Sequence, residues 1–387
     1  MMRRRDAARR KTIFHLIFAT PSLYVILRWL LPLSLPVWTK GAVAIGVLAA
    51  SQFHFWSRLS SGSVFAPEFP RGIVILFNWA FGALLLLALL QIVLDLGTLA
   101  AMLVRREALA APDAVRYGLA GVALLLAAIG VAGAIRVPPI RDVTVAVHDL
   151  PPAFDGYRLV QLTDLHISRL FPQRWTRAVV DRTNAAGADL IVVTGDFIDG
   201  SVDMRRADVA PLAGLRAPDG VYAIPGNHEY FFDYRGWMRH LAGLGFRLLP
   251  NAHRVLTRGN DAILLAGVTD LSAPAHGEAG PDLDAALLRR PLGAPIVLLD
   301  HQPRNARRAA ARGVALQLSG HTHGGMIAGL DRLFKPANGG FVSGRYAVDG
   351  MTLYVSNGTG LWPGFALRLG RPPEITRITL RRAAPGG

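Results

Sequence analysis

The sequence predicts a layered α/β domain preceded by a helical membrane region, and three observations support this. Long apolar runs crowd the first third of the 387-residue chain, whereas the remainder has the composition of a globular domain. From residue 157 onward, apolar strands alternate with helical segments, which favours α/β layering. Five of these strands end in polar clusters: "TDLH", "GDFID", "GNHE", "DHQP" and "GHTH". We expect a multi-pass transmembrane region over residues 1–139 and the α/β domain over 140–382.

The composition limits the chemistry. Mean hydropathy is +0.32, which is high for a wholly soluble protein. No cysteine is present, so disulfides, thiolate metal sites and cysteine nucleophiles are excluded, and any metal ligands must be His, Asp, Asn or Glu. The net charge of +15 suits phosphates, anionic lipids or nucleic acid, but membrane-flanking arginines explain it equally well. Because no nucleic-acid-binding signature occurs, no nucleic-acid partner is expected.

Four apolar segments are candidate membrane spans: about 13–31, 41–57, 73–95 and 117–135. A span needs roughly 20 mostly apolar residues, a length that the third and fourth satisfy and the second does not reach. The N-terminal tail carries six basic residues, which predicts that it lies in the cytoplasm. Four crossings of the inner membrane return the chain to the cytoplasm. If the segment 41–57 does not cross, the α/β domain lies outside.

The domain is expected to begin after the linker "RVPPIRDV" at 136–143. Segments that combine an apolar run with a polar end are predicted as strands at 157–166, 188–200, 219–230, 294–303 and 314–323. Helices are predicted at 171–187, where Gly187 ends the pattern, and at 304–313. Shorter alternating segments predict strands at 340–348, 351–358 and 373–380.

The polar strand ends predict a metal site. In an open α/β sheet, strand ends at one edge form the ligand crevice. If the segments stay extended, residues i and i+2 face the same side, so Asp164 would point with His166, and His321 with His323. Carboxylate, amide and imidazole ligands together suit Mn, Fe or Zn. Seven candidate ligands are too many for one ion and favour two ions roughly 3.5–4 Å apart, bridged by a carboxylate and a hydroxide. These candidates are Asp164, His166, Asp196, Asn227, His301, His321 and His323.

The ordered blocks "DLH", "GDFID", "GNHE", a later His and "GHTH" resemble the calcineurin-like metallophosphoesterase family over about residues 157–380. "SGHTHGG", "SNGTG" and "RPPEI" further resemble its membrane-associated bacterial branch, and the layout is similar to transmembrane proteins with a metallophosphoesterase domain. The resemblance implies a four-layer α/β/β/α sandwich. Met326 departs from the pattern, because relatives often have Gln there, and this puts a substrate contact in doubt.

The resemblance also implies residue roles. The first metal would be held by Asp164, His166, Asp196 and His323, and the second by Asp196, Asn227, His301 and His321. His228 looks like the family's phosphate-contacting histidine, which in an extended segment would face away from the metal of Asn227. Asp199 looks like the carboxylate that orients His228 and raises its pKa. The implied reaction is hydrolysis of a phosphate ester by a metal-bridging hydroxide.

Substrate and alternative functions stay open at this level. Attachment to a bilayer makes a lipid headgroup a candidate, and a phosphodiester or lipid-linked phosphate is favoured over a phosphomonoester. One alternative is a catalytically inactive or regulatory membrane sensor or scaffold, but no ligand is missing. Another is a transporter, but only Asp95 is acidic within the apolar runs. In a third alternative, the polar clusters are turn and cap residues that bind no metal. The seven candidate ligands would then be left without partners, which costs free energy.

Overall fold

The computed structural model describes residues 19–383, which form two compact units. The first unit comprises the chain up to Gly133 together with the short segment Pro363–Leu367. The second comprises Ala134–Trp362 and the residues from Arg368 onward. The first is helical, and the second contains both sheets.

Two helices of the first unit are long and apolar enough to cross a membrane. They are α4, Arg71–Arg105, and α5, Asp113–Ile135. At 1.5 Å per residue, the 35 residues of α4 extend over about 52 Å, more than the roughly 30 Å of a bilayer core. Large apolar side chains of α5 such as Leu125 and Ile129 are more than half exposed, which is typical of a helix that faces lipid.

The expected spans at 73–95 and 117–135 fall within α4 and α5. The expected first span begins outside the described residues; its described part is helical over 19–25 and continues as a π-helical turn, Ile26–Leu30. The expected span at 41–57 is wrong as a single helix. The structure has α2, Val37–Ser51, and α3, Phe53–Ser61, which meet at the non-helical residue Gln52. With 15 residues, α2 covers about 22 Å, which is too short to span the bilayer core.

Two polar side chains of α4, Asp95 and Asn78, form hydrogen bonds within the helical unit. Asp95 of α4 accepts hydrogen bonds from Tyr24 at 2.7 Å and Arg28 at 2.9 Å, which ties the first helix to α4. Asn78 of α4 donates to the carbonyl of Pro363 at 2.8 Å and accepts from the amide of Ala366 at 2.6 Å. These bonds explain why Pro363–Leu367 belongs to the helical unit, since an unpaired amide in an apolar setting is costly.

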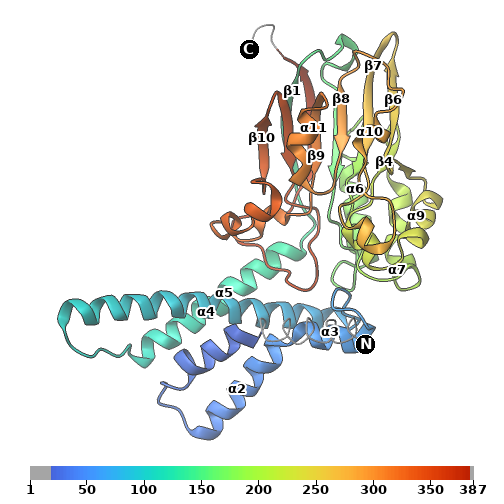
Figure 1. The fold of residues 1–387 in the computed structure, drawn as a ribbon. Helices are drawn as coiled ribbons and strands as arrows, with labels where there is room; N and C mark the ends of the chain where they lie inside the picture. Colours follow the sequence, from blue (N-terminus) through green and yellow to red (C-terminus); the bar gives the residue numbers. More distant parts are fainter. Residues whose placement is uncertain (1–18, 384–387) are drawn as a thin grey trace, which may run out of the picture. The chain divides into compact units, whose positions relative to one another are not determined.

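Two six-stranded sheets form the centre of the second unit (Figure 1). The first has the order β1-β12-β2-β3-β4-β5, with bounds Ile140–Val147, Ile375–Arg382, Arg158–Leu162, Leu190–Val193, Val221–Ala223 and Arg247–Leu248. The second has the order β10-β11-β9-β8-β7-β6, with bounds Gly344–Val348, Met351–Val355, Val314–Ser319, Ile296–Leu299, Asp261–Gly267 and Ala252–Arg258.

Parallel pairing at the centre of each sheet brings the polar strand ends together. Strands β2, β3 and β4 are parallel neighbours, and so are β9, β8 and β7. Parallel neighbours end at the same edge of their sheet, so the segments that follow β2, β3 and β4 share one edge, as do those after β8 and β9. The polar clusters after β2, β3 and β4 therefore lie along the edge of the first sheet in the same order as in the sequence.

Alternating side chains of the strands build two apolar layers. Leu159 and Val192 of the first sheet and Leu299 and Leu316 of the second share one fully buried core between the sheets. The opposite face of the second sheet packs against the last two helices of the unit. The helices are α6 Gln173–Asn184, α7 Val202–Val209, α8 Asn227–Phe231, α9 Tyr234–Gly243, α10 Leu283–Ala286 and α11 Ala306–Ala310. Helices α6 and α7 connect the parallel strands of the first sheet. The α/β/β/α prediction is therefore confirmed (Figure 1).

The expected linker at 136–143 is partly wrong. Residues from Ile140 onward already form β1, which pairs in parallel with β12. Two ion pairs strengthen this pairing: Arg141 with Glu374 at 2.8 Å and Asp142 with Arg377 at 2.6 Å. The segment IRDVTVAV is an edge strand in which apolar and polar residues alternate, and it was interpreted as a linker because two prolines precede it.

Candidate metal centre

The seven predicted ligands all lie at the carboxyl edges of the two sheets. They come from five connections. Asp164 and His166 follow β2, Asp196 follows β3, Asn227 begins α8 after β4, His301 follows β8, and His321 and His323 follow β9. All are buried except His321 and His323, which are half-buried.

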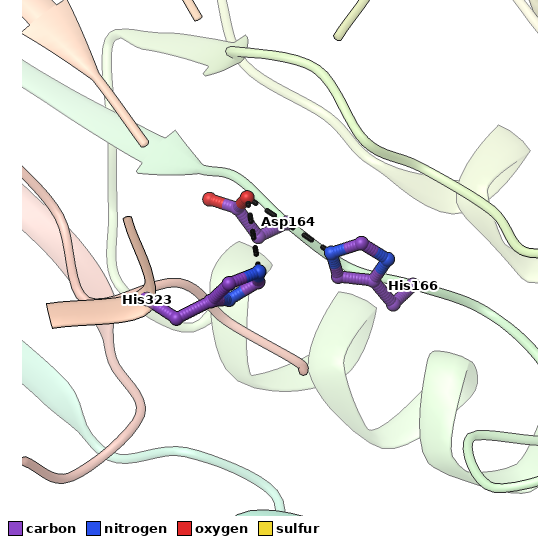
Figure 2. Close-up of side chains that lie close together, drawn as sticks. All are labelled: Asp164, His166 and His323. Atoms are coloured by element: carbon purple, nitrogen blue, oxygen red, sulfur yellow. Dashed lines mark ion pairs between the residues drawn. The ribbon is translucent and has the colours of Figure 1, made fainter. Parts of the chain in front are cut away.

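One cluster contains Asp164, His166 and His323, and Figure 2 shows both imidazole rings turned toward the Asp164 carboxylate. The Nε2 atoms of His166 and His323 lie 4.0 and 3.8 Å from Asp164 Oδ1. These distances are too long for hydrogen bonds. They suit ligand atoms around one ion, because atoms that are each about 2.0–2.2 Å from a shared cation lie about 3–4 Å apart.

A second cluster contains Asp196, His301 and His321. His301 Nε2 lies 3.2 Å from Asp196 Oδ2 and 3.1 Å from Asn227 Oδ1, and His321 Nδ1 lies 2.9 Å from the same amide oxygen. Asp196 Oδ2 is also 3.7 Å from His166 Nε2. The carboxylate of Asp196 therefore adjoins both clusters.

Hydrogen bonds at the far nitrogen set the tautomers of two histidines. His301 Nδ1 lies 2.7 Å from the carbonyl of Thr194, so Nδ1 carries the proton and Nε2 is left as a lone-pair donor. His166 Nδ1 lies 3.1 Å from Asp199 Oδ2. Its Nε2 is fully buried and has no hydrogen-bond partner among residues 19–383. Such an atom is costly unless it binds something, so the residues present fit a divalent cation.

Backbone geometry differs from the expectation. Asp164, His166, Asp196, His321 and His323 all have left-handed backbones, with φ between 45° and 67°. The predicted i, i+2 pairs, Asp164 with His166 and His321 with His323, therefore do not lie in extended segments. Asn227 and His228 begin the helix α8. The side chains converge because each chain turns sharply after its strand, at a cost of about 1–3 kcal/mol per non-glycine residue. Strain of this kind persists only where surrounding contacts hold it.

Asp199 links two histidines. One carboxylate oxygen lies 2.5 Å from His228 Nδ1, and the other contacts His166 Nδ1. Burial lowers the pKa of His228, but the charges of Asp196 and Asp199 outweigh this and raise that pKa to about 9. Burial likewise raises the pKa of Asp199, and the two histidines overcome the effect and lower it. His228 therefore carries a proton at neutral pH.

Glu229 positions the turn that carries Asp196, a role that the sequence analysis did not assign. Its carboxylate accepts hydrogen bonds from the backbone amides of Asp196, Phe197 and Gly226 at 3.1, 2.8 and 2.7 Å. The sequence contains a signal for this role. Gly226 is the N-cap residue of α8, and Glu229 stands three residues after it, where a Glu side chain accepts the N-cap backbone N–H in a capping box.

Glycine is required where two connections touch. A Cβ on Gly226 would lie 2.3 Å from Asp196 Oδ1 and 2.5 Å from its backbone nitrogen. A Cβ on Gly320 would lie 2.2 Å from Asp164 Oδ2. Both glycines therefore allow close approach of backbone to a cluster carboxylate.

The chain is similar in sequence to known proteins of one family. Residues 157–325 match the family described as Calcineurin-like phosphoesterase. The "Transmembrane protein with metallophosphoesterase domain" of Danio rerio is 35% identical, over 67% of this chain and 61% of that protein. The "Uncharacterized metallophosphoesterase YkuE" of Bacillus subtilis is 32% identical, over 60% of this chain and 82% of that protein. Among solved structures, the calcineurin-like phosphoesterase YfkN of Bacillus subtilis matches with a TM-score of 0.33 and 16% identity, over 54% of this chain and 82% of that chain.

The close packing at Gly226 generates a prediction. The substitution Gly226→Ala should weaken Mn²⁺ binding by about 10–100-fold, because the added methyl group displaces the Asp196 carboxylate. Equilibrium dialysis of the purified chain measures this. Gly243→Ala is the matched control, since a Cβ there meets no atom within 4 Å. Unchanged binding by the Gly226 variant would contradict the described contact.

Proposed function

This chain belongs to the calcineurin-like metallophosphoesterase family, and from this premise we propose that it is a membrane-bound hydrolase of phosphate esters that uses two divalent metal ions. One observation carries the proposal: two clusters of buried or half-buried imidazole and carboxylate groups adjoin the single carboxylate of Asp196. The chain spans about 61% of the length of the vertebrate relatives that it matches, so the activity is inferred from its own site.

Each ion has a defined set of residues. The first would be held by Asp164, His166, Asp196 and His323, and the second by Asp196, Asn227, His301 and His321. This mix of nitrogen and oxygen ligands suits Mn, Fe or Zn. When bound, the two ions supply positive charge to the phosphate oxygens and a water whose pKa is lowered for attack on phosphorus.

His228 supplies the proton that the reaction needs. Its Nδ1 is held by Asp199, and in this proposal its Nε2–H donates the proton to the leaving oxygen. The oxygen of water forms a bond to phosphorus and gives up one proton to solvent, the ester P–O bond breaks, and the proton from His228 goes to the leaving oxygen. His228 then regains a proton from solvent. No covalent phospho-enzyme is required, because water itself is the nucleophile.

A phosphodiester or a lipid-linked phosphate is the favoured substrate class over a phosphomonoester. The apolar helices α4 and α5 support attachment to a membrane, which would bring the site to lipid headgroups. The names of the vertebrate relatives also describe transmembrane proteins. A binding-only sensor is less well supported, since all seven ligands and the His228–Asp199 pair are in place.

The side of the membrane depends on the number of crossings. A cytoplasmic site needs an even number of crossings, and of the four that the sequence suggests, α2 is too short to supply one. With the basic N-terminal tail in the cytoplasm and three crossings, by the apolar segment expected at about 13–31, by α4 and by α5, the α/β domain would lie outside the inner membrane. We therefore propose the extracytoplasmic position that the sequence analysis gave for a chain whose segment 41–57 does not cross.

Cysteine labelling tests this topology. The natural chain has no cysteine, so a single cysteine at Leu292, whose side chain is 94% exposed, reports on the catalytic domain alone. A membrane-impermeant maleimide added to right-side-out spheroplasts should label Leu292→Cys. The control Ala7→Cys, in the N-terminal tail, should react only after lysis. Protection of Leu292→Cys until lysis would instead establish a cytoplasmic domain.

Metal content and turnover test the proposed activity. The purified full chain should contain about two divalent ions and hydrolyse bis-p-nitrophenyl phosphate faster than p-nitrophenyl phosphate. EDTA should abolish turnover and added Mn²⁺ should restore it. Asp196→Asn should impair binding of both ions because this carboxylate adjoins both clusters, whereas His323→Ala should impair one. Absence of divalent metal together with no turnover in Mn²⁺ would refute the enzyme proposal.

The proton-donor role of His228 predicts a leaving-group effect. His228→Asn should lower kcat by about 10²–10⁴-fold for an alkyl phosphate ester, and less for a p-nitrophenyl ester, whose leaving group needs little protonation. Asp199→Asn removes a charge that raises the His228 pKa, so the fall in kcat that accompanies loss of the proton, near pH 9 in the native chain, should move to lower pH. Equal losses for both esters would argue against proton donation.

A further inference from the structure

The structure points to Arg368 as a residue that acts on the first cluster without belonging to it. We propose that Arg368 is a positioning residue whose guanidinium holds the backbone of His323 directly and supports that of Asp164 through the turn 357–360. The inference rests on the proposed metal-dependent function. It adds a residue from the loop after β11, a region to which the sequence analysis assigned no site role.

The guanidinium of Arg368 is bonded to backbone carbonyls on several segments. The residue is only 4% exposed. Nη1 donates to the carbonyls of His323 at 3.1 Å and Arg371 at 3.2 Å, and Nη2 donates to those of Asn357 at 2.6 Å and Gly360 at 2.8 Å. A guanidinium stays protonated in proteins, so all four hydrogen bonds keep their donors at neutral pH.

The bonds to Asn357 and Gly360 lead to Asp164. These two residues are the ends of a turn that lies against the end of β2. Within the turn, the amide of Thr359 donates to the carbonyl of Thr163 at 2.8 Å, and the amide of Gly360 donates to the carbonyl of Asp164 at 2.8 Å. By fastening both ends of the turn, Arg368 fixes the surface that holds the strained backbone of Asp164, whose φ is 52°.

Among the described residues, His323 lacks the Nδ1 hydrogen bond that orients other histidines of the site, and Arg368 supports its backbone instead. His166 and His301 are each oriented by a hydrogen bond at Nδ1, to Asp199 and to Thr194 respectively. His323 Nδ1 is buried and has no hydrogen-bond partner in the described part of the chain. Its ring is therefore oriented through the backbone, which is left-handed at φ 51° and is held at its carbonyl by Arg368.

These contacts meet at one point. A Cβ on Gly358 would lie 3.1 Å from Asp164 Cβ, 3.3 Å from Arg368 Nη2 and 3.3 Å from His323 Nδ1. Asp164, His323 and Arg368 thus surround a single glycine with no space between them for a side chain. Loss of the guanidinium would allow the two ligands to relax independently, which weakens the first cluster and leaves the second in place.

Mn²⁺ binding to the purified full chain tests the role. Arg368→Met should raise the dissociation constant of one ion by about 10–100-fold and leave that of the other unchanged. His323→Ala should weaken the same ion. The double variant should show little further loss, because both changes act on one support. Arg368→Lys keeps the charge but not the planar fork of donors, so it should fall between Arg368→Met and the native chain.

Controls separate positioning from general stability. Arg377→Met removes an arginine of β12 that bonds Asp142 and the carbonyl of Ala186, and it should leave both dissociation constants unchanged. If Arg368→Met does not fold, Arg368→Lys carries the test. Native binding of both ions by the Arg368 variants, equal weakening of both ions, or additive losses with His323→Ala would overturn the positioning role. A native chain that binds no Mn²⁺ would instead contradict the proposed function itself.

Discussion

The carboxylate of Asp196 is the group on which the rest of the catalytic domain depends. It is 1% exposed, and a buried carboxylate costs several kcal/mol unless positive or polar groups surround it. Burial raises its pKa, but His301 and His228 overcome this and hold that pKa well below the usual range. The ring of His301 belongs to the second sheet and His228 to the first, so this carboxylate joins the two sheets at their functional edge.

The surrounding structure supports the clusters mainly through the backbone. Glu229 holds the amide of Asp196, the carbonyl of Thr194 orients His301, and Arg368 holds the carbonyl of His323. This arrangement follows from the left-handed turns that carry the ligands, because a strained backbone needs hydrogen bonds to its own amides and carbonyls. Groups of this kind keep ligands in place before an ion binds, and so strengthen binding.

The two units meet different physical demands. In the helical unit, apolar side chains such as Leu125 and Ile129 are exposed, others such as Val74 are buried, and the polar groups of Asn78 and Asp95 are hydrogen-bonded. In the catalytic domain, apolar side chains fill the layers between and beside the sheets, and polar groups concentrate at one edge. The short segment Pro363–Leu367 belongs to the helical unit. The next residue, Arg368, belongs to the second unit and bonds the carbonyl of His323.

The sequence by itself predicted the candidate ligand types, their order and the strands that carry them. The structure brings these residues to one edge because residues such as Asp164 and Asp196 follow apolar runs, and parallel strands must end at a common edge. It also identified α4 and α5, whose length and apolarity are local properties. Strand β1 and the break at Gln52 were missed, because edge pairing and helix continuity depend on neighbours that local patterns do not contain.

Only the tertiary structure decided how the ligands reach one another. The expected extended pairs are left-handed turns, stabilised by contacts between connections that are far apart in the chain. Arg368 bonds a carbonyl 45 positions away, and His321 donates its amide to Asp164 from 157 positions away. No periodicity or spacing records such bonds, because a guanidinium that binds a carbonyl places no requirement on the identity of its partner's side chain.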